Sequence, residues 1–195
     1  RRPRGRPRGT PAQPLPIPGL GETHVTDLDV PQTVLRRVAP GPMRHDPDFI
    51  AASVLNHILG GSAFTSRLFQ EVRESRGLCY SVYAFHWGFS DTGIFGVHAA
   101  TGGNDLPELM PVIVDELRKS SQTIHQEEID RARAQIRAQL LMGQESPAAR
   151  AGQMARQMML YGRPIPNEEM MERLNDITRE RLTDLAGRLF FDTVP

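Results

Sequence analysis

Apolar residues follow two different spacings along this chain, and the spacing changes near residue 101. Before that point, the segments HVTDLDV (24–30) and TVLRRV (33–38) are short and rich in β-branched residues, so each predicts a strand. Alternating apolar residues at 78–85 and the run IFGVHAA at 94–100 predict two more strands, which the turn residues at 90–93 would join as an antiparallel hairpin.

Two helices are predicted between these strands. Asp46-Pro47 supplies a helix cap and a first-position proline, and apolar residues then recur at helical spacing until Gly60-Gly61. A second helix follows a short loop of small residues and ends at Gly77. Glycine suits the left-handed backbone conformation that often closes a helix, so we expect a sharp turn there.

Beyond residue 101 the apolar residues recur at the 3.6-residue period of an α-helix almost without interruption. The first helix is capped by Asn104-Asp105 and runs through Leu117, and four more are predicted at 126–142, 147–160, 167–175 and 178–190. The eight methionines are expected to fill interfaces between these helices. Strands followed by a run of helices indicate an α+β fold. We therefore expect two layers, a mostly antiparallel sheet with helices packed on one face.

The first twenty residues differ in composition from the rest. They hold five arginines, no acidic residue, six prolines and three glycines, a mixture that cannot bury apolar surface. We expect residues 1–22 to form a flexible Arg/Pro-rich linker and residues 23–195 to form one folded domain, which a length of 195 residues allows. The formal net charge of zero thus combines a basic segment with an acidic remainder.

The linker contains RPRGRPRG, which resembles an AT-hook, a short segment whose arginines enter the narrow minor groove of A·T-rich DNA. A DNA-tethered domain is therefore one functional alternative. The segment occurs once, no second basic patch accompanies it, and the rest of the chain is acidic. We expect a linker here and no nucleic-acid partner, with only weak, salt-sensitive retention of DNA.

The sequence lacks the patterns of several kinds of site. No apolar run approaches the roughly 18 to 20 residues of a membrane span, so no membrane partner is expected. The single cysteine, Cys79, excludes an internal disulfide framework and is compatible with either the cytoplasm or the periplasm. None of the six histidines lies in H-E-x-x-H or the inverted H-x-x-E-H. We expect no metal or other cofactor in this chain, with His57 and His98 packed and Cys79 unreactive.

Arg73 and Tyr80 are the candidate site residues. They lie seven positions apart, and a tight return at Gly77 can bring both to one end of the sheet. An arginine offers a planar fork of donors to peptide carbonyls, and a tyrosine hydroxyl can donate to a developing oxyanion. The alternative for each is structural: an arginine beside Glu71 and Glu74 is often only solvated, and a tyrosine in a strand is often part of the core.

A wider resemblance extends over nearly all of the chain after residue 23. Its motifs occur in the order LNHILGG, SRLFQEVRESRGLCYSVYAF, SDTGIFGVHAATG, EEIDRARAQIRAQLL and MLYGRPIPNEEMMERLNDIT. This series resembles the C-terminal, non-zinc-binding half of a bacterial pitrilysin/insulinase-type zinc metallopeptidase of the mitochondrial processing peptidase-like branch. The segment GGSAFTSRL is slightly longer than the form usual in that family.

The resemblance implies a chain that works with a zinc-bearing N-terminal half or partner subunit around a closed chamber that admits a peptide substrate. By this resemblance, Arg73 and Tyr80 bind the substrate, and Tyr80 is also an auxiliary catalytic residue that donates to the oxyanion. The zinc would lie on the partner half, so the isolated chain would hold no stoichiometric zinc and cleave no peptide. The family also contains halves and subunits that serve assembly without catalysis. A non-catalytic interaction subunit is therefore the other main alternative.

Overall fold

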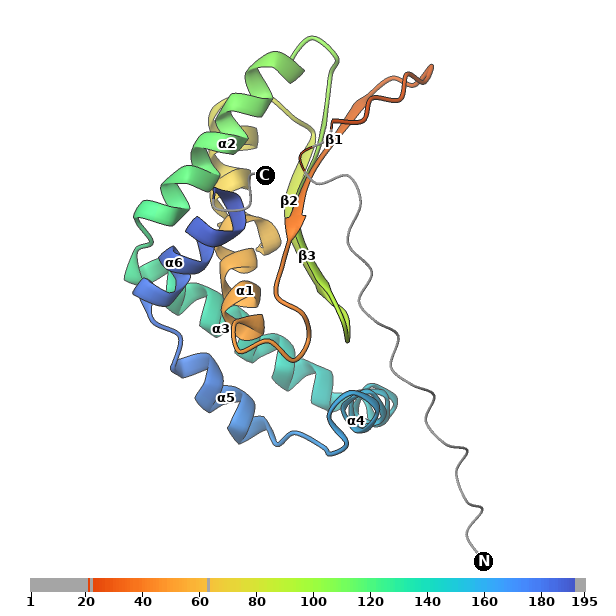
Figure 1. Cartoon of the computed structure of the whole chain (residues 1–195), viewed down its shortest axis with the longest axis vertical. Helices are drawn as coiled ribbons and strands as arrows, with labels where there is room; N and C mark the ends of the chain where they lie inside the picture. Colours follow the sequence, from red (N-terminus) through yellow and green to blue (C-terminus); the bar gives the residue numbers. More distant parts are fainter. Residues whose placement is uncertain (1–20, 22, 63, 192–195) are drawn as a thin grey trace, which may run out of the picture.

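The computed structural model of the chain describes residues 21, 23–62 and 64–191. These residues form a three-stranded antiparallel sheet, and the helices lie against one of its faces (Figure 1). The two-layer α+β architecture expected from the sequence is therefore confirmed. The predicted linker over residues 1–22 lies almost entirely outside the described residues and stays a prediction.

Strand β3 (Gly93–Thr101) is the centre of the sheet. Strand β1 (Thr33–Pro40) pairs with one of its edges, and strand β2 (Ser81–Gly88) pairs with the other. The pairing of β2 with β3 is the antiparallel hairpin that the sequence predicts. Its first strand begins at Ser81, three residues later than predicted, so Tyr80 lies just before the strand.

The predicted strand at 24–30 is wrong. The segment forms no strand, and Val25, Leu28 and Val30 are largely exposed. A strand exists only where a neighbouring backbone completes its hydrogen-bond ladder, and among the described residues β1 pairs with β3 alone. The β-branched composition of 24–30 therefore shows strand propensity without a partner.

All five helices predicted after residue 101 are present, and the two earlier helices are partly wound as π-helices. The helices of the described residues are α1 (Phe49–Asn56), η1 (His57–Gly61), η2 (Phe69–Ser75), α2 (Leu106–Gln122), α3 (Gln126–Glu145), α4 (Pro147–Tyr161), α5 (Asn167–Asn175) and α6 (Arg179–Phe190), where η marks π-helical winding. Among these residues no helix combines the length and the apolar character needed to cross a bilayer.

The core lies between the sheet and the helices α1, α2 and α6. Phe95, in the middle of β3, is fully buried and meets Phe190 of α6 edge-on, with the two ring centres 5.6 Å apart. Helix α1 contributes four fully buried side chains to the same layer: Ala51, Ala52, Val54 and Leu55. Burying this apolar surface holds the helices to one face of the sheet.

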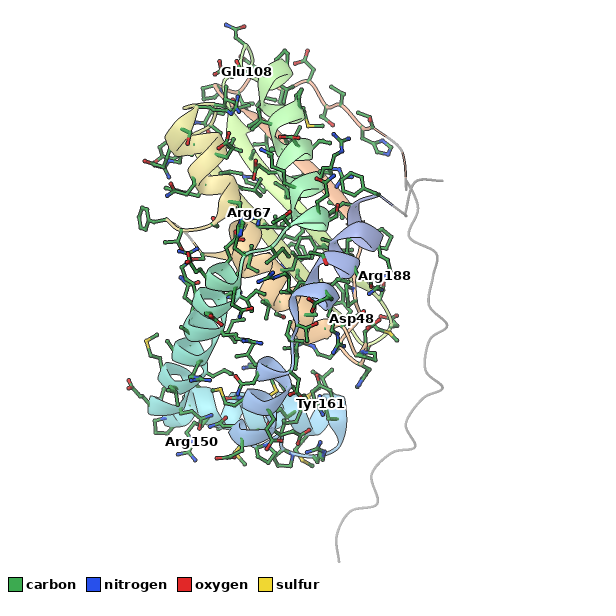
Figure 2. All side chains as sticks on the ribbon, turned by 90° about the vertical axis from the view of Figure 1, so that its left-hand side faces the viewer. Asp48, Arg67, Glu108, Arg150, Tyr161 and Arg188 are labelled. Carbon is green, nitrogen blue, oxygen red and sulfur yellow. The ribbon has the colours of Figure 1, made fainter. Side chains whose placement is uncertain are left out.

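Asp48, at the start of α1, connects that helix to α6. Its carboxylate accepts hydrogen bonds from Arg181 Nε at 2.8 Å and from Arg188 Nη2 at 2.7 Å. Figure 2 shows Asp48 and Arg188 next to each other. Burial by itself would raise the pKa of Asp48, but the hydrogen bonds and charges of the two arginines outweigh it and lower this pKa.

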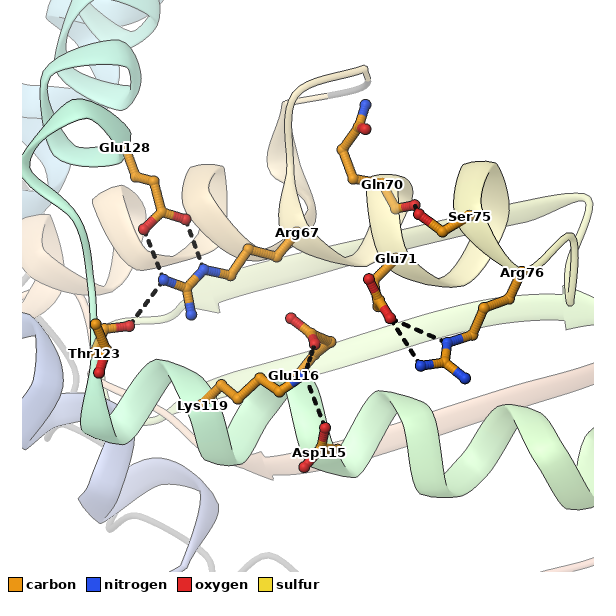
Figure 3. A network of polar contacts seen from close by, with 10 residues as sticks. All are labelled: Arg67, Gln70, Glu71, Ser75, Arg76, Asp115, Glu116, Lys119, Thr123 and Glu128. Atoms are coloured by element: carbon orange, nitrogen blue, oxygen red, sulfur yellow. Dashed lines mark hydrogen bonds and ion pairs between the residues drawn. The ribbon is translucent and has the colours of Figure 1, made fainter.

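A second ion pair connects the segment before η2 to α3. Arg67 donates from Nε to Glu128 Oε1 and from Nη2 to Glu128 Oε2, both at 2.6 Å, and Nη2 also donates to the Thr123 carbonyl at 2.8 Å (Figure 3). Glu128 Oε2 accepts the backbone N–H of His125 at 2.8 Å. Burial would raise the pKa of Glu128, but these donors outweigh it and lower the pKa. The chain leading into η2 is therefore fixed to the start of α3.

Helix α4 differs from the other helices because none of its residues is buried. Three of its methionines are exposed to about half or more, and Met159 reaches 81 %. The expectation that the methionines fill helix interfaces is therefore wrong for α4 within the described part of the chain.

Gly60 allows η1 to lie directly on β2, and Gly60→Ala should destabilise the protein. A β-carbon at this position would lie 2.2 Å from the backbone nitrogen of Ala84, so the helix and the strand would have to separate. We expect a loss of about 1–3 kcal/mol in the free energy of unfolding, typical of overpacking in a core. Urea titration followed by circular dichroism measures it.

Gly143→Ala is the matched control for this substitution. Gly143 lies in α3 and a β-carbon there meets no atom within 4 Å. Alanine should therefore stabilise the protein by about 0.5 kcal/mol through its better helix propensity. Equal effects of the two substitutions would contradict the packing of η1 on β2.

Glu128→Gln should destabilise the protein at neutral pH and have little effect in acid. Because the pKa of Glu128 is lowered in the folded state, its stabilising contribution is complete above the unfolded pKa near 4.5 and is lost as the pH falls through the lower folded value. We expect a difference of about 1–3 kcal/mol at pH 7 and a smaller difference at pH 3, below the unfolded pKa. Glu127→Gln, at an exposed neighbour in the same helical turn, should change stability little at either pH. A Glu128→Gln effect of equal size at both pH values would contradict the ionic role.

Candidate functional site

The turn between η2 and β2 brings the candidate residues together. Gly77 has a φ angle of +64°, in the left-handed region that residues with a β-carbon rarely adopt. Its N–H donates to the Arg73 carbonyl at 3.0 Å, and the N–H of Leu78 donates to the Val72 carbonyl at 3.0 Å. These bonds close the end of η2 and turn the chain back toward the sheet, as the sequence predicts for this glycine.

Tyr80 is anchored through its backbone while its side chain stays exposed. The N–H of Tyr80 donates to the Ala100 carbonyl at 3.0 Å, which attaches the residue to the end of β3. The side chain is 73 % exposed, whereas Cys79 before it and Val82 after it are buried. Tyr80 is therefore not a core residue, and the structural alternative for this tyrosine is wrong.

Arg73 lies between two aromatic rings. Its guanidinium carbon is 5.7 Å from the ring centre of Tyr80 and 4.9 Å from the ring centre of Phe69. The structure thus brings Arg73 and Tyr80 together at the end of the sheet. Phe69, which the sequence analysis does not single out, is the third member of this group. A phenylalanine four residues before an arginine on one helix is the pattern from which this contact could have been predicted.

Arg73 has no carboxylate partner among the described residues. Glu71 instead accepts from Arg76 Nη2 at 2.9 Å and from Arg76 Nε at 3.1 Å (Figure 3). No hydrogen bond joins Arg73 to Glu74 in the described part of the chain. The N–H donors of Arg73 are therefore available to a ligand, and the exposed side chain of Tyr80 lies beside the guanidinium.

Cys79 directly precedes Tyr80 in the chain and is 8 % exposed. Burial raises the pKa of the Cys79 thiol, and the positive charge of Arg73 lowers it by a smaller amount. A thiol whose pKa is raised is mostly protonated at neutral pH and is a poor nucleophile. A buried thiol with a raised pKa fits the expectation that Cys79 is unreactive, which stays a prediction.

The histidines singled out by the sequence have structural contacts. His57 has its Nδ1 2.9 Å from the Ser53 carbonyl, and His98 stacks on Tyr83 with ring centres 4.6 Å apart. Burial lowers the pKa of His98, and the charge of Arg36 lowers it further. In the described part of the chain, no three His, Cys, Asp or Glu side chains gather as a possible metal site.

A polar groove of about 500 Å³ lies between η2, α2 and the start of α3. Both of its basic side chains are engaged with acidic residues that also line it, because Arg67 pairs with Glu128 and Lys119 pairs with Glu116 at 2.7 Å (Figure 3). Arg73 and Tyr80 do not line it. The candidate site is thus an exposed surface at the end of the sheet and not this groove.

The reactivity of Cys79 tests the position of Arg73 without any enzymatic assay. Because Arg73 lowers the raised pKa of the thiol, Arg73→Ala should raise this pKa further and slow alkylation by iodoacetamide at a given pH. The pH profile of the alkylation rate of the native protein measures the change. Arg76→Ala, which removes an exposed arginine paired with Glu71, should leave the profile unchanged. An unchanged or lower pKa in Arg73→Ala would place Arg73 away from the thiol.

Comparison with known proteins gives a consistent result. The family described as "Peptidase M16 inactive domain" matches residues 3–136. An uncharacterized zinc protease of Rickettsia felis is 31% identical over 176 residues, which cover 90% of this chain and 43% of that protein. A probable mitochondrial-processing peptidase subunit beta of Arabidopsis thaliana is 28% identical over 179 residues, covering 88% of this chain and 34% of that protein.

Solved structures agree with these relatives. The crystal structure of a peptidase M16 inactive domain from Pseudomonas fluorescens superposes with a TM-score of 0.73 at 30% identity, over 83% of this chain and 38% of that one. The chain therefore spans less than half the length of these relatives. Together with the sheet, the helices and the ordered motifs, these matches show that the chain belongs to the peptidase M16 family and corresponds to its inactive domain.

Proposed function

We propose that this chain is the substrate-binding half of a zinc endopeptidase and that Arg73 and Tyr80 contact the peptide. The observation that carries the proposal is the pairing of an arginine without a carboxylate partner in the described residues and a tyrosine that is 73 % exposed. Both side chains thus offer hydrogen-bond donors that are not committed to the protein core.

The zinc belongs to the other half of the protein in this proposal. Relatives named as zinc proteases are more than twice as long as the part that this chain covers, so they have room for a second half. The described residues offer no cluster of ligands that fits a zinc ion. A partner that carries the metal, either on the same polypeptide or as a separate subunit, completes the enzyme and supplies the Lewis acid for peptide hydrolysis.

Arg73 would bind the peptide before the reaction. A guanidinium donates two parallel N–H bonds to oxygens, and a peptide in an extended conformation presents carbonyl oxygens at its edge. The neighbouring rings restrict the arginine side chain, so little conformational entropy is lost when the peptide binds. Arg73 thus contributes to affinity in the ground state.

Tyr80 would act later, when water adds to the scissile carbonyl. The carbonyl oxygen becomes negative at that point, and a hydroxyl donor stabilises it more than it stabilises the neutral carbonyl. The backbone bond from Tyr80 to the Ala100 carbonyl fixes the position from which the hydroxyl reaches out. The chain would serve only assembly if neither residue met a substrate, and the exposure of Tyr80 supports the catalytic alternative.

Substitutions in the complete protein, with its zinc-bearing half, distinguish these roles. Tyr80→Phe should lower kcat by about 100-fold with little change in peptide affinity, since a donor to the transition state is lost. Arg73→Ala should also weaken peptide binding, and the double variant should lose less than the sum of the two free energies. Steady-state cleavage of an unfolded peptide measures all three.

Tyr83→Phe is the control, because it removes the same hydroxyl from a half-exposed tyrosine that stacks on His98 instead of lying beside Arg73. If Tyr80→Phe retains full kcat, Tyr80 is no oxyanion donor. Unchanged kcat and affinity in both Tyr80→Phe and Arg73→Ala would favour a non-catalytic interaction subunit.

A further inference from the structure

Phe69 is the residue that most restricts Arg73. The guanidinium carbon of Arg73 lies closer to the Phe69 ring, at 4.9 Å, than to the Tyr80 ring, at 5.7 Å. Phe69 is 6 % exposed, and Phe64 packs edge-on against it with ring centres 5.3 Å apart. A buried, packed ring is a fixed support for a cation, whereas the ring of Tyr80 is mostly exposed.

The π-helical winding of η2 arranges the charges around this support. In a π-helix the backbone bonds run from residue i to i+5, so residues five apart approach each other more closely than they do in an α-helix. Glu71 of η2 and Arg76, the residue that directly follows η2, are five apart and form an ion pair at 2.9 Å. The pair occupies the carboxylate of Glu71, and in the described part of the chain Arg73 forms no ion pair with Glu74 either, so its guanidinium lies over a ring instead of being bound to an acid.

A cation–π contact holds the arginine without using up its hydrogen bonds. The attraction acts between the positive charge and the face of the ring, so no N–H donor is committed to a carboxylate or carbonyl oxygen. An ion pair with a glutamate would fix the side chain equally well but would occupy two donors. Support by Phe69 therefore combines a restricted position with free donors, as a peptide-binding arginine requires.

We propose that Phe69 is a positioning residue that holds Arg73 in its peptide-binding position. The proposal rests on the proposed function, since it assigns to Phe69 an effect on peptide affinity that is transmitted only through Arg73. It excludes a direct contact between Phe69 and the peptide, because the ring is buried beneath the arginine. It also differs from a purely structural role, in which Phe69 would affect folding and leave the coupling to Arg73 at zero.

A double-mutant cycle in the complete protein tests this inference. The zinc is removed with a chelator to prevent cleavage, and the affinity for fluorescein-labelled β-casein, an unfolded polypeptide, is measured by anisotropy. Phe69→Leu should weaken binding by about fivefold, because it removes a cation–π contact but keeps an apolar side chain. In the Arg73→Ala background, Phe69→Leu should have no further effect. Phe69→Tyr should restore the affinity because it restores the ring.

Phe49→Leu is the matched control. Phe49 also lies beneath an arginine, with the guanidinium carbon of Arg44 4.5 Å from its ring centre, but at the start of α1. The substitution Phe49→Leu should therefore leave the affinity for casein unchanged. If Phe69→Leu fails to fold, Phe69→Met fills the same space with a flexible side chain and replaces it in the cycle.

The outcomes separate this inference from the proposed function. If Arg73→Ala weakens binding but Phe69→Leu does not, or if Phe69→Leu has the same effect in both backgrounds, Phe69 does not act through Arg73 and the inference is wrong. If Arg73→Ala itself leaves the affinity unchanged, the proposed function of Arg73 fails and the inference fails with it. The inference and the proposed function are both supported if Phe69→Leu weakens casein binding only when Arg73 is present and Phe69→Tyr restores the affinity.

Discussion

The left-handed turn at Gly77 is the constraint on which the site depends. It ends η2, reverses the chain and places Tyr80 beside Arg73 within a few residues. Hydrogen bonds at both ends of the turn and the ladder bond from Tyr80 to β3 fix its position relative to the sheet. Upstream, the Arg67–Glu128 ion pair fixes the chain that enters η2 to α3. The local turn and a long-range ion pair together give an exposed surface a defined geometry.

Most of the fold follows from local sequence signals, because the signals and the packing agree. The helices after residue 101 have a clear period and identifiable ends, and the hairpin of β2 and β3 has alternating strands around a turn. The segment 24–30 shows the limit of such signals: its composition favours a strand, but a strand requires a partner, and composition does not encode the partner's position. The exposed methionines of α4 show the same limit for helix packing.

The site was predictable in part. Spacing and the glycine indicated that Arg73 and Tyr80 could meet, and the structure shows their contact, but the role of the pair rests on the proposed function. Sequence could not decide whether Tyr80 is buried, since its neighbours Cys79 and Val82 are both in the core. The sequence also gave no reason to pair Glu71 with Arg76, because residues five apart are not neighbours on an α-helix and the π-helical winding of η2 was not predicted.

The most direct test of the account asks whether this surface meets a peptide. Tyr80 would be replaced by the photoreactive p-benzoylphenylalanine in the complete, zinc-depleted protein, which is then illuminated with labelled β-casein, and cross-linked products are identified by mass spectrometry. Position 159 on α4, where Met159 is 81 % exposed, serves as the comparison. The account predicts cross-links to casein from position 80 and few from position 159. Cross-links from position 80 that reach only the protein's own residues, or equal yields from both positions, would contradict it.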